Sequence, residues 1–204
     1  MGLMDGWVLS KRVILVTGTP CVGKTSVAQL LTSKLDALYV NLTELAVREN
    51  LISGRDEERG GSIIVDESKI QRRIRQIVSD CTKKDVVIDG HYAVNVVPTK
   101  LVSFVLVLRR DPVELRKLME HCGFSGRKLW ENLASEILDV CLVDALNVHG
   151  EGKVCELDVT SKSAEETVAE ILDVLDGQKR CFVGIVDWLG KLEREGLLEE
   201  FLRI

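Results

Sequence analysis

Short runs of apolar residues are the strongest pattern along the chain. They lie at residues 13–16, 86–88 and 104–108, and the mixed segment at 154–157 predicts one further strand. Continuous apolarity over so few residues is typical of strands that are covered on both faces. Because helical patterns separate these runs, the sequence predicts an α/β fold with a parallel sheet.

Apolar residues spaced three or four positions apart predict the helices between these strands. Ile70, Ile74 and Val78 follow Asp66 with this spacing, so they share one face of a helix. A longer repeat of the same kind covers residues 127–147 and predicts one continuous helix there.

Two helix starts are also marked by their capping residues. Asp111 precedes Pro112 and, three positions on, Glu114. Ser163 is followed three positions later by Glu166. Both patterns supply side chains for backbone amides that the first turn of a helix leaves unpaired, and therefore predict helices that begin at these sites.

Composition and charge limit the class of protein. The 204 residues are enough for one domain, and 27 basic against 32 acidic residues give a net charge of −5. This balance argues against a protein that coats nucleic acid or membrane through bulk charge. Six cysteines without a C-x-x-C pair indicate reduced thiols. With no apolar run of about 18 residues, we expect a cytoplasmic protein without a membrane partner.

Residues 18–25 read GTPCVGKT and match the phosphate-binding pattern G-x-x-x-x-G-K-[ST]. The motif directly follows a predicted strand and precedes a helical run, as a phosphate-binding loop (P-loop) requires. The glycines allow backbone amides to surround phosphate, while Lys24 can reach the outer phosphates of ATP and Thr25 can bind Mg²⁺. The candidate nucleotide-binding residues are Gly18, Cys21, Val22, Gly23, Lys24, Thr25 and Ser26.

Cys21 is an unusual residue within this loop. Its small side chain can point away from the phosphates, or its thiol can take part in redox chemistry, because a helix N-terminus lowers the pKa of a thiol. In the second case oxidation would block the nucleotide site.

Asp89 and His91 form a second candidate group after the strand at 86–88. In a parallel sheet an acid in this position faces the P-loop, so Asp89 can hold Mg²⁺ through its water shell. His91 can orient an attacking water or a second phosphate, or it can make a structural hydrogen bond.

With these motifs the chain resembles the adenylate kinase isoenzyme 6 family, which includes the coilin-interacting nuclear ATPase and archaeal relatives. The resemblance covers about residues 13–175. It rests on GTPCVGKT, on NLTELA at 41–46, on Val65-Asp66-Glu67, on Ile88-Asp89-Gly90-His91, on Leu108-Arg109 before Asp111-Pro112, and on Glu131-Asn132 followed by Ser135-Glu136-Ile137-Leu138-Asp139.

This resemblance implies one P-loop kinase domain of the nucleoside monophosphate kinase type, with a five-stranded parallel sheet. It also implies a monophosphate-binding excursion at 42–66, a lid at 121–131 and a helical extension at 181–204. The implied activities are adenylate kinase and ATPase, with ATP and Mg²⁺ as cofactors. The implied partners are AMP, a small-subunit ribosomal protein and the pre-ribosomal particle, because the family acts in maturation of that subunit.

The chain departs from the family at two arginine positions. Cys122 stands before Gly123 where the family has the lid arginine, and Val47 replaces an arginine on the monophosphate side. An arginine clamp accelerates phosphoryl transfer strongly. Arg48, Arg116 and Arg127 are candidate substitutes or ordinary exposed arginines. The resemblance, which includes Leu108-Arg109, implies that Arg109 is a candidate cofactor-binding residue. The candidate substrate-binding residues are Thr43, Arg48, Asp66, Arg116 and Arg127.

Three functions remain open at this point: a nucleoside monophosphate kinase, an ATP-driven switch that docks to a ribosomal protein or RNA, and a kinase for another small acceptor.

Overall fold

The computed structural model of the protein describes residues 11–56 and 62–202. Its centre is a five-stranded parallel sheet with the strand order β2-β5-β1-β6-β7. The four predicted strands are confirmed, whereas the short and more polar β2 had no clear signal of its own. The strands are β1 (Arg12–Thr17), β2 (Leu38–Asn41), β5 (Asp85–Asp89), β6 (Phe104–Arg109) and β7 (Val154–Asp158).

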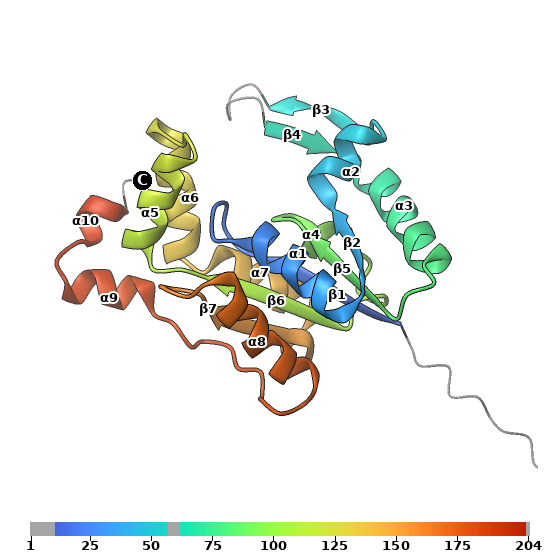
Figure 1. Cartoon of the computed structure of the whole chain (residues 1–204). Coiled ribbons are helices and arrows are strands. Elements are labelled where there is room, and N and C mark those ends of the chain that lie inside the picture. Colours follow the sequence, from blue (N-terminus) through green and yellow to red (C-terminus); the bar gives the residue numbers. More distant parts are fainter. Residues whose placement is uncertain (1–10, 57–61, 203–204) are drawn as a thin grey trace, which may run out of the picture.

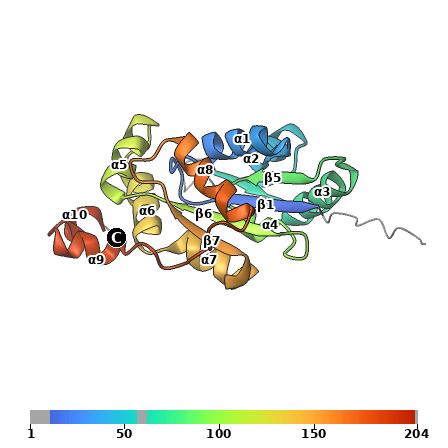
Figure 2. The same ribbon diagram turned by 60° about the horizontal axis from the view of Figure 1, so that its bottom comes forward.

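Helices cover both faces of this sheet (Figure 1; Figure 2). Figure 2 shows α1 and α8 on one face and α4 and α7 on the other. The helices are α1 (Lys24–Leu35), α2 (Leu42–Arg48), α3 (Glu67–Asp80), α4 (Ala93–Val96), α5 (Pro112–His121), α6 (Gly126–Ile137), α7 (Val140–His149), the 3-10 helix η1 (Glu151–Lys153), α8 (Ala164–Leu175), α9 (Trp188–Arg194) and α10 (Leu198–Phe201).

The two helix layers explain the continuous apolar runs. In β1, Ile14 and Val16 pack into the hydrophobic cluster on one face, and Val13 and Leu15 pack into the cluster on the other. All four are at most 1% exposed. Since successive side chains of a strand point to opposite faces, a strand between two helix layers needs apolar residues at every position.

The predicted helix starts at Asp111 and Ser163 are confirmed, and the helix predicted after Asp66 is α3, which this aspartate caps. The Asp66 carboxylate accepts the Lys69 amide of α3, and Asp111 accepts the amides of the first turn of α5. Ser163 and Glu166 form a complete capping box. Glu114 is different, because its carboxylate pairs with Arg110 instead of returning to the cap.

The prediction of one helix over residues 127–147 is wrong. The chain forms α6 and α7, and Asp139 between them has a left-handed backbone with φ 57°. Arg109 explains the break. Its Nη2 donates to the Glu136 carbonyl oxygen at 2.8 Å and to the Asp139 carboxylate at 2.5 Å. The guanidinium therefore satisfies a carbonyl group in the last turn of α6, where the helix ends.

Three segments stand apart from the sheet and its helices. The strands β3 (Ile52–Asp56) and β4 (Ser62–Val65) form an antiparallel pair, so the ends of the predicted excursion are ordered, and its middle lies outside the described residues. In Figure 1 this pair and the α5–α6 pair lie on opposite sides of the loop between β1 and α1. The helices α9 and α10 pack beside α6. The boundaries of the excursion, lid and extension stay predictions.

The described residues also show whether a helix could cross a membrane and whether the cysteines are paired. None of the helices in this part of the chain has the length and apolar character needed to cross a membrane. All six cysteines are free thiols.

A buried arginine joins three acidic residues next to the sheet. Arg109 is 1% exposed, and its Nε and Nη1 donate to Glu136 at 2.9 Å and to Glu156 at 2.7 Å. The two glutamates are also buried, at 1% and 3% exposed. Buried charges require partners, so removing the arginine would leave these carboxylates without compensation.

We therefore expect Arg109→Met to reduce the free energy of unfolding by about 3–5 kcal/mol. The measurement is urea denaturation followed by circular dichroism. Arg127→Met is the control, because the Arg127 side chain is 87% exposed, and its change should stay within about 0.5 kcal/mol. A loss below about 1 kcal/mol for Arg109→Met would contradict the assigned role of this arginine.

Candidate active site

Two glycines shape the loop between β1 and α1. Gly18 has φ 138°, and a Cβ there would lie 2.5 Å from the carbonyl oxygen of Leu108. Gly23, which caps α1, has φ 110°. Side chains are disfavoured in this conformation, so glycine at both positions lets the loop turn tightly against β6 and enter the helix.

The N-terminus of α1 is open to an anion. No side chain caps it, and its first turn holds no acidic residue. The first amides of the helix therefore remain without an acceptor inside the helix, which favours phosphate binding. Lys24 folds across the loop, and its Nζ donates to the Thr19 carbonyl at 2.8 Å. Burial lowers the pKa of Lys24, and the nearby Asp89 carboxylate acts in the opposite direction.

Asp89 lies beside this loop and receives three hydrogen bonds. Its Oδ2 accepts the Thr25 hydroxyl at 2.7 Å, the Tyr39 hydroxyl at 3.1 Å and the Asn41 amide at 3.3 Å. The structure thus brings the predicted pair of Thr25 and Asp89 together. Tyr39 and Asn41 were not predicted. The only signal for them was their position in the polar end of an unrecognised strand.

The residues at this point suit a magnesium ion. Asp89 and Thr25 offer oxygen ligands, which Mg²⁺ prefers. The described residues contain no group of three or more His, Cys, Asp or Glu side chains placed to hold a metal. One carboxylate and one hydroxyl agree with a Mg²⁺ that is bound mainly through phosphate and water.

His91 follows β5 at the same edge of the sheet. It is exposed to solvent, and its ring meets the ring of Tyr92 edge-on at 4.9 Å between centroids. Although His91 is exposed at the border of the cleft, desolvation by the protein atoms around its ring, and then the positive charges of Lys24 and Lys128, lower the pKa of His91 to about 4. The imidazole is therefore neutral near pH 7 and can accept a hydrogen bond.

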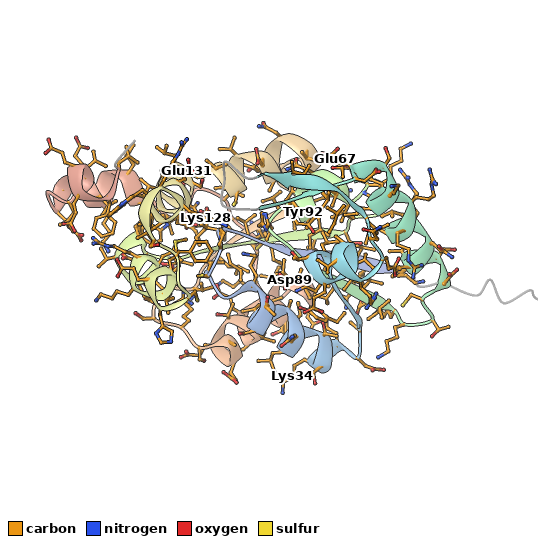
Figure 3. All side chains as sticks on the ribbon, turned by 90° about the horizontal axis from the view of Figure 1, so that it is seen from above. Lys34, Glu67, Asp89, Tyr92, Lys128 and Glu131 are labelled. Carbon is orange, nitrogen blue, oxygen red and sulfur yellow. The ribbon has the colours of Figure 1, made fainter. Side chains whose placement is uncertain are left out.

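A cleft of about 560 Å³ opens in front of these groups. Figure 3 shows Asp89 and Tyr92 near the middle of the molecule, with Lys128 on α6 to one side. The predicted residues Thr43 and His91 line the cleft together with residues from the P-loop, α4, α6 and α7. The lining residues are Thr19, Pro20, Thr43, His91, Tyr92, Asn95, Phe124, Lys128, Asn132, Ser135, Val140, Cys141 and Asp144.

A smaller pocket of about 200 Å³ lies at the start of α1. The Arg110 guanidinium borders it, donates from Nε to the Val22 carbonyl at 3.2 Å and pairs with Glu114. Sequence reasoning missed Arg110, because it follows a strand without a recognisable motif. The pocket is lined by Val22, Gly23, Ser26, Val27, Arg110, Val159, Lys162, Ser163, Ala164 and Thr167.

The structure places the predicted arginines away from the cleft. Arg109, predicted to bind the cofactor, is instead a buried partner of Glu136 and Glu156. Arg116 pairs with Glu120 and Glu200 and packs on the rings of Trp130 and Phe201, and Arg127 pairs with Glu131 in solvent. None of the three lines the cleft, because carboxylates or aromatic rings outside it hold their guanidinium groups.

Arg48 and Asp66 also lie outside the cleft. The Arg48 side chain is 70% exposed, pairs with Glu49 and borders a separate hollow between β2 and α3. The Asp66 carboxylate is used as the cap of α3 and pairs with Lys69. Of the five predicted substrate-binding residues, Thr43 alone lines the cleft.

Cys21 has a left-handed backbone, with φ 64°, and packs against the hydrophobic cluster. Burial, followed by the neighbouring thiol of Cys122, raises the pKa of Cys21 to about 12. A thiol in this state is protonated and weakly nucleophilic, which favours a packing role for its side chain.

Glu136 connects the P-loop with distant elements and was not predicted to be part of the site. It accepts the Thr19 hydroxyl of the loop, the Arg110 amide at 3.1 Å and the Trp188 indole of α9 at 3.1 Å. The signal available in the sequence was a glutamate beside the apolar stripe of a helix, within the motif that supports the family resemblance.

The sheet and the loop define the class of protein as a P-loop kinase fold. A thymidylate kinase from Candida albicans superimposes with a TM-score of 0.52 at 13% identity, over 83% of this chain and 92% of that one. A shikimate kinase from Bacteroides thetaiotaomicron superimposes with a TM-score of 0.51 at 16% identity, over 81% of this chain and 98% of the other. At these identities the likeness concerns the fold alone.

Sequence relatives identify the family. Residues 14–139 match the family model described as an AAA domain. Proteins named "Putative adenylate kinase" from Pyrococcus furiosus and Thermococcus onnurineus are 37% and 39% identical to the chain, and each match covers 86% of this chain and 91% of the relative. The chain belongs to this family of archaeal adenylate kinase relatives.

The shifted pKa of His91 predicts a pH dependence of stability. In the unfolded chain the imidazole titrates near 6.5, and in the folded chain near 4. Between these values the unfolded chain binds a proton that the folded chain does not, so stability falls as the pH is lowered through this window. We expect His91→Asn to lose less stability than the wild type between pH 7 and pH ~4.5. Urea denaturation measures this, with His121→Asn at the exposed end of α5 as the control. Equal losses in His91→Asn and wild type would contradict it.

Proposed function

We propose that the protein is an adenylate kinase that transfers the γ-phosphoryl group of ATP to AMP. The observation that carries this proposal is the position of the uncapped N-terminus of α1, with Lys24 and the Thr25–Asp89 pair, beside the cleft of about 560 Å³. A phosphate site next to a cleft of this size provides room for a donor and an acceptor. The archaeal relatives support the choice of AMP.

Each part of the substrates has a place in this proposal. The phosphates of ATP lie on the P-loop amides and Lys24, and the adenine lies in the smaller pocket, where the planar guanidinium of Arg110 can stack. AMP lies in the larger cleft, near Thr43 and Tyr92. The two substrates then meet in front of Lys24.

The transfer breaks the bond between the γ-phosphorus and the β–γ bridging oxygen and forms one to a phosphate oxygen of AMP. ADP is produced on both sides, and dianionic AMP gives up no proton. Mg²⁺ held near Thr25 and Asp89 neutralises phosphate charge when it is bound. The chain contributes mainly position and charge, which is what this reaction requires.

The reverse reaction gives the sharpest test. An adenylate kinase forms ATP and AMP from ADP alone, whereas an ATPase does not, so luciferase detection of ATP after adding ADP separates the two. We expect ATP formation by the wild type and a loss of at least about 10²-fold in Lys24→Met, whose melting temperature should stay unchanged. Without ATP formation by the wild type, the proposal fails.

Two alternatives are tested with the same preparation. The family resemblance also implies an ATP-driven switch in maturation of the small ribosomal subunit, and ATP turnover that AMP does not stimulate would favour this function. ADP release stimulated by a different acceptor, such as CMP or UMP, would favour a kinase for that acceptor.

The proposed Mg²⁺ site predicts the effect of Asp89→Asn. Asparagine keeps the shape of the side chain but removes the charge that attracts the ion. We expect the enhancement of ATP affinity by Mg²⁺ to decrease by about 10-fold or more, with ATP affinity in the absence of Mg²⁺ little changed. Calorimetric titrations with and without Mg²⁺ measure both values. An unchanged enhancement would place the ion elsewhere.

A further inference from the structure

The charge that the lid region presents to the cleft comes from a lysine. Lys128 lies in the first turn of α6, and Asn132 and Ser135 follow it four and seven residues later. All three line the cleft of about 560 Å³. Residues with this spacing share one face of a helix, so the face of α6 that carries Lys128 is the face that borders the site.

Lys128 differs from the neighbouring arginines in its partners. Arg116 and Arg127 are held by carboxylates outside the cleft. Within the described part of the chain, no carboxylate lies within ion-pair distance of the Lys128 ammonium group, which is 5.7 Å from the centre of the Phe124 ring. Phe124 itself lines the cleft, so the ring keeps the ammonium group at its border.

Two lysines act on the same space. The charges of Lys24 and Lys128 both act on His91, which lines the cleft together with Thr19 and Pro20 of the P-loop. The two positive charges repel each other, and an anion between them offsets this repulsion because it attracts both. The P-loop adds the positive end of α1 on the same side. This arrangement of positive charges is suited to binding phosphate groups. The residue that ends α5, Cys122, adds no positive charge to it.

We propose that Lys128 is a catalytic residue that contacts the transferred phosphoryl group, in place of the arginine that position 122 lacks. This inference rests on the proposed kinase function. The ammonium group compensates the charge on the phosphoryl oxygens while the bond to ADP breaks and the bond to AMP forms. A cation at this place acts mainly on the transition state, and so on kcat more than on the KM of either substrate.

The test compares Lys128→Met, Lys128→Arg and the control Lys117→Met. Lys117 is an exposed lysine of α5 outside the cleft, so its change removes the same charge from the same region. We expect Lys128→Met to lower kcat by about 10²-fold, with both KM values within about threefold of wild type. Lys128→Arg should keep most of the activity, and Lys117→Met should stay within about twofold of wild type. Wild-type kcat in Lys128→Met would overturn the proposal, as would an equal loss in Lys117→Met.

A binding measurement separates this proposal from the proposed function. Diadenosine pentaphosphate joins two adenosines through five phosphates and binds without turnover. We expect its affinity, measured by calorimetry, to fall at least about 10-fold in Lys128→Met and to be unchanged in Lys117→Met. If the wild type binds the probe but forms no ATP from ADP, the proposed kinase function is wrong. The affinities of wild type and Lys128→Met for the probe still show whether Lys128 contacts phosphate. Equal affinities in wild type and Lys128→Met would show that Lys128 does not contact phosphate.

Discussion

The ion pair between Arg109 and Glu136 is the interaction on which the arrangement of the site depends. Both side chains are 1% exposed, so each charge needs the other and a complete set of hydrogen bonds. Glu136 meets this need with the Thr19 hydroxyl from the P-loop and the Trp188 indole from α9. One carboxylate therefore joins β6, α6, the phosphate loop and the C-terminal helices.

The same arginine determines the shape of the cleft. By bonding the Glu136 carbonyl and the Asp139 carboxylate, Arg109 ends α6 and lets α7 start in a new direction. Both helices then line the cleft, α6 with Ser135 and α7 with Cys141. One continuous helix over α6 and α7 could not line two sides of the cleft, because its straight axis would carry the residues after Asp139 away from the P-loop.

The positive charges at the site are those of two lysines, which lie at the P-loop and the cleft, because the arginines near it are paired with carboxylates elsewhere. Arg116 of α5 and Arg127 of α6 have carboxylate partners outside the cleft, and Arg109 is bound within the core. Lys24 and the uncapped end of α1 instead lie at the P-loop, and Lys128 lines the cleft beside it. This distribution favours a phosphate-bearing ligand in a chain whose overall charge is negative.

The sequence by itself determined the features that depend on near neighbours: the apolar strands, the capped helices, the P-loop and the Asp89 that follows a strand. The apolar repeat predicted within residues 127–147 also marks the face of α6 that is buried, where Leu129 and Leu133 lie. Only the tertiary structure decided what each arginine does and which lysine borders the cleft. The physical reason is that the guanidinium of Arg109 is identical in sequence terms to that of Arg116 or Arg127. Its role depends on carboxylates 27 and 47 residues away, which only the folded chain brings within hydrogen-bond distance.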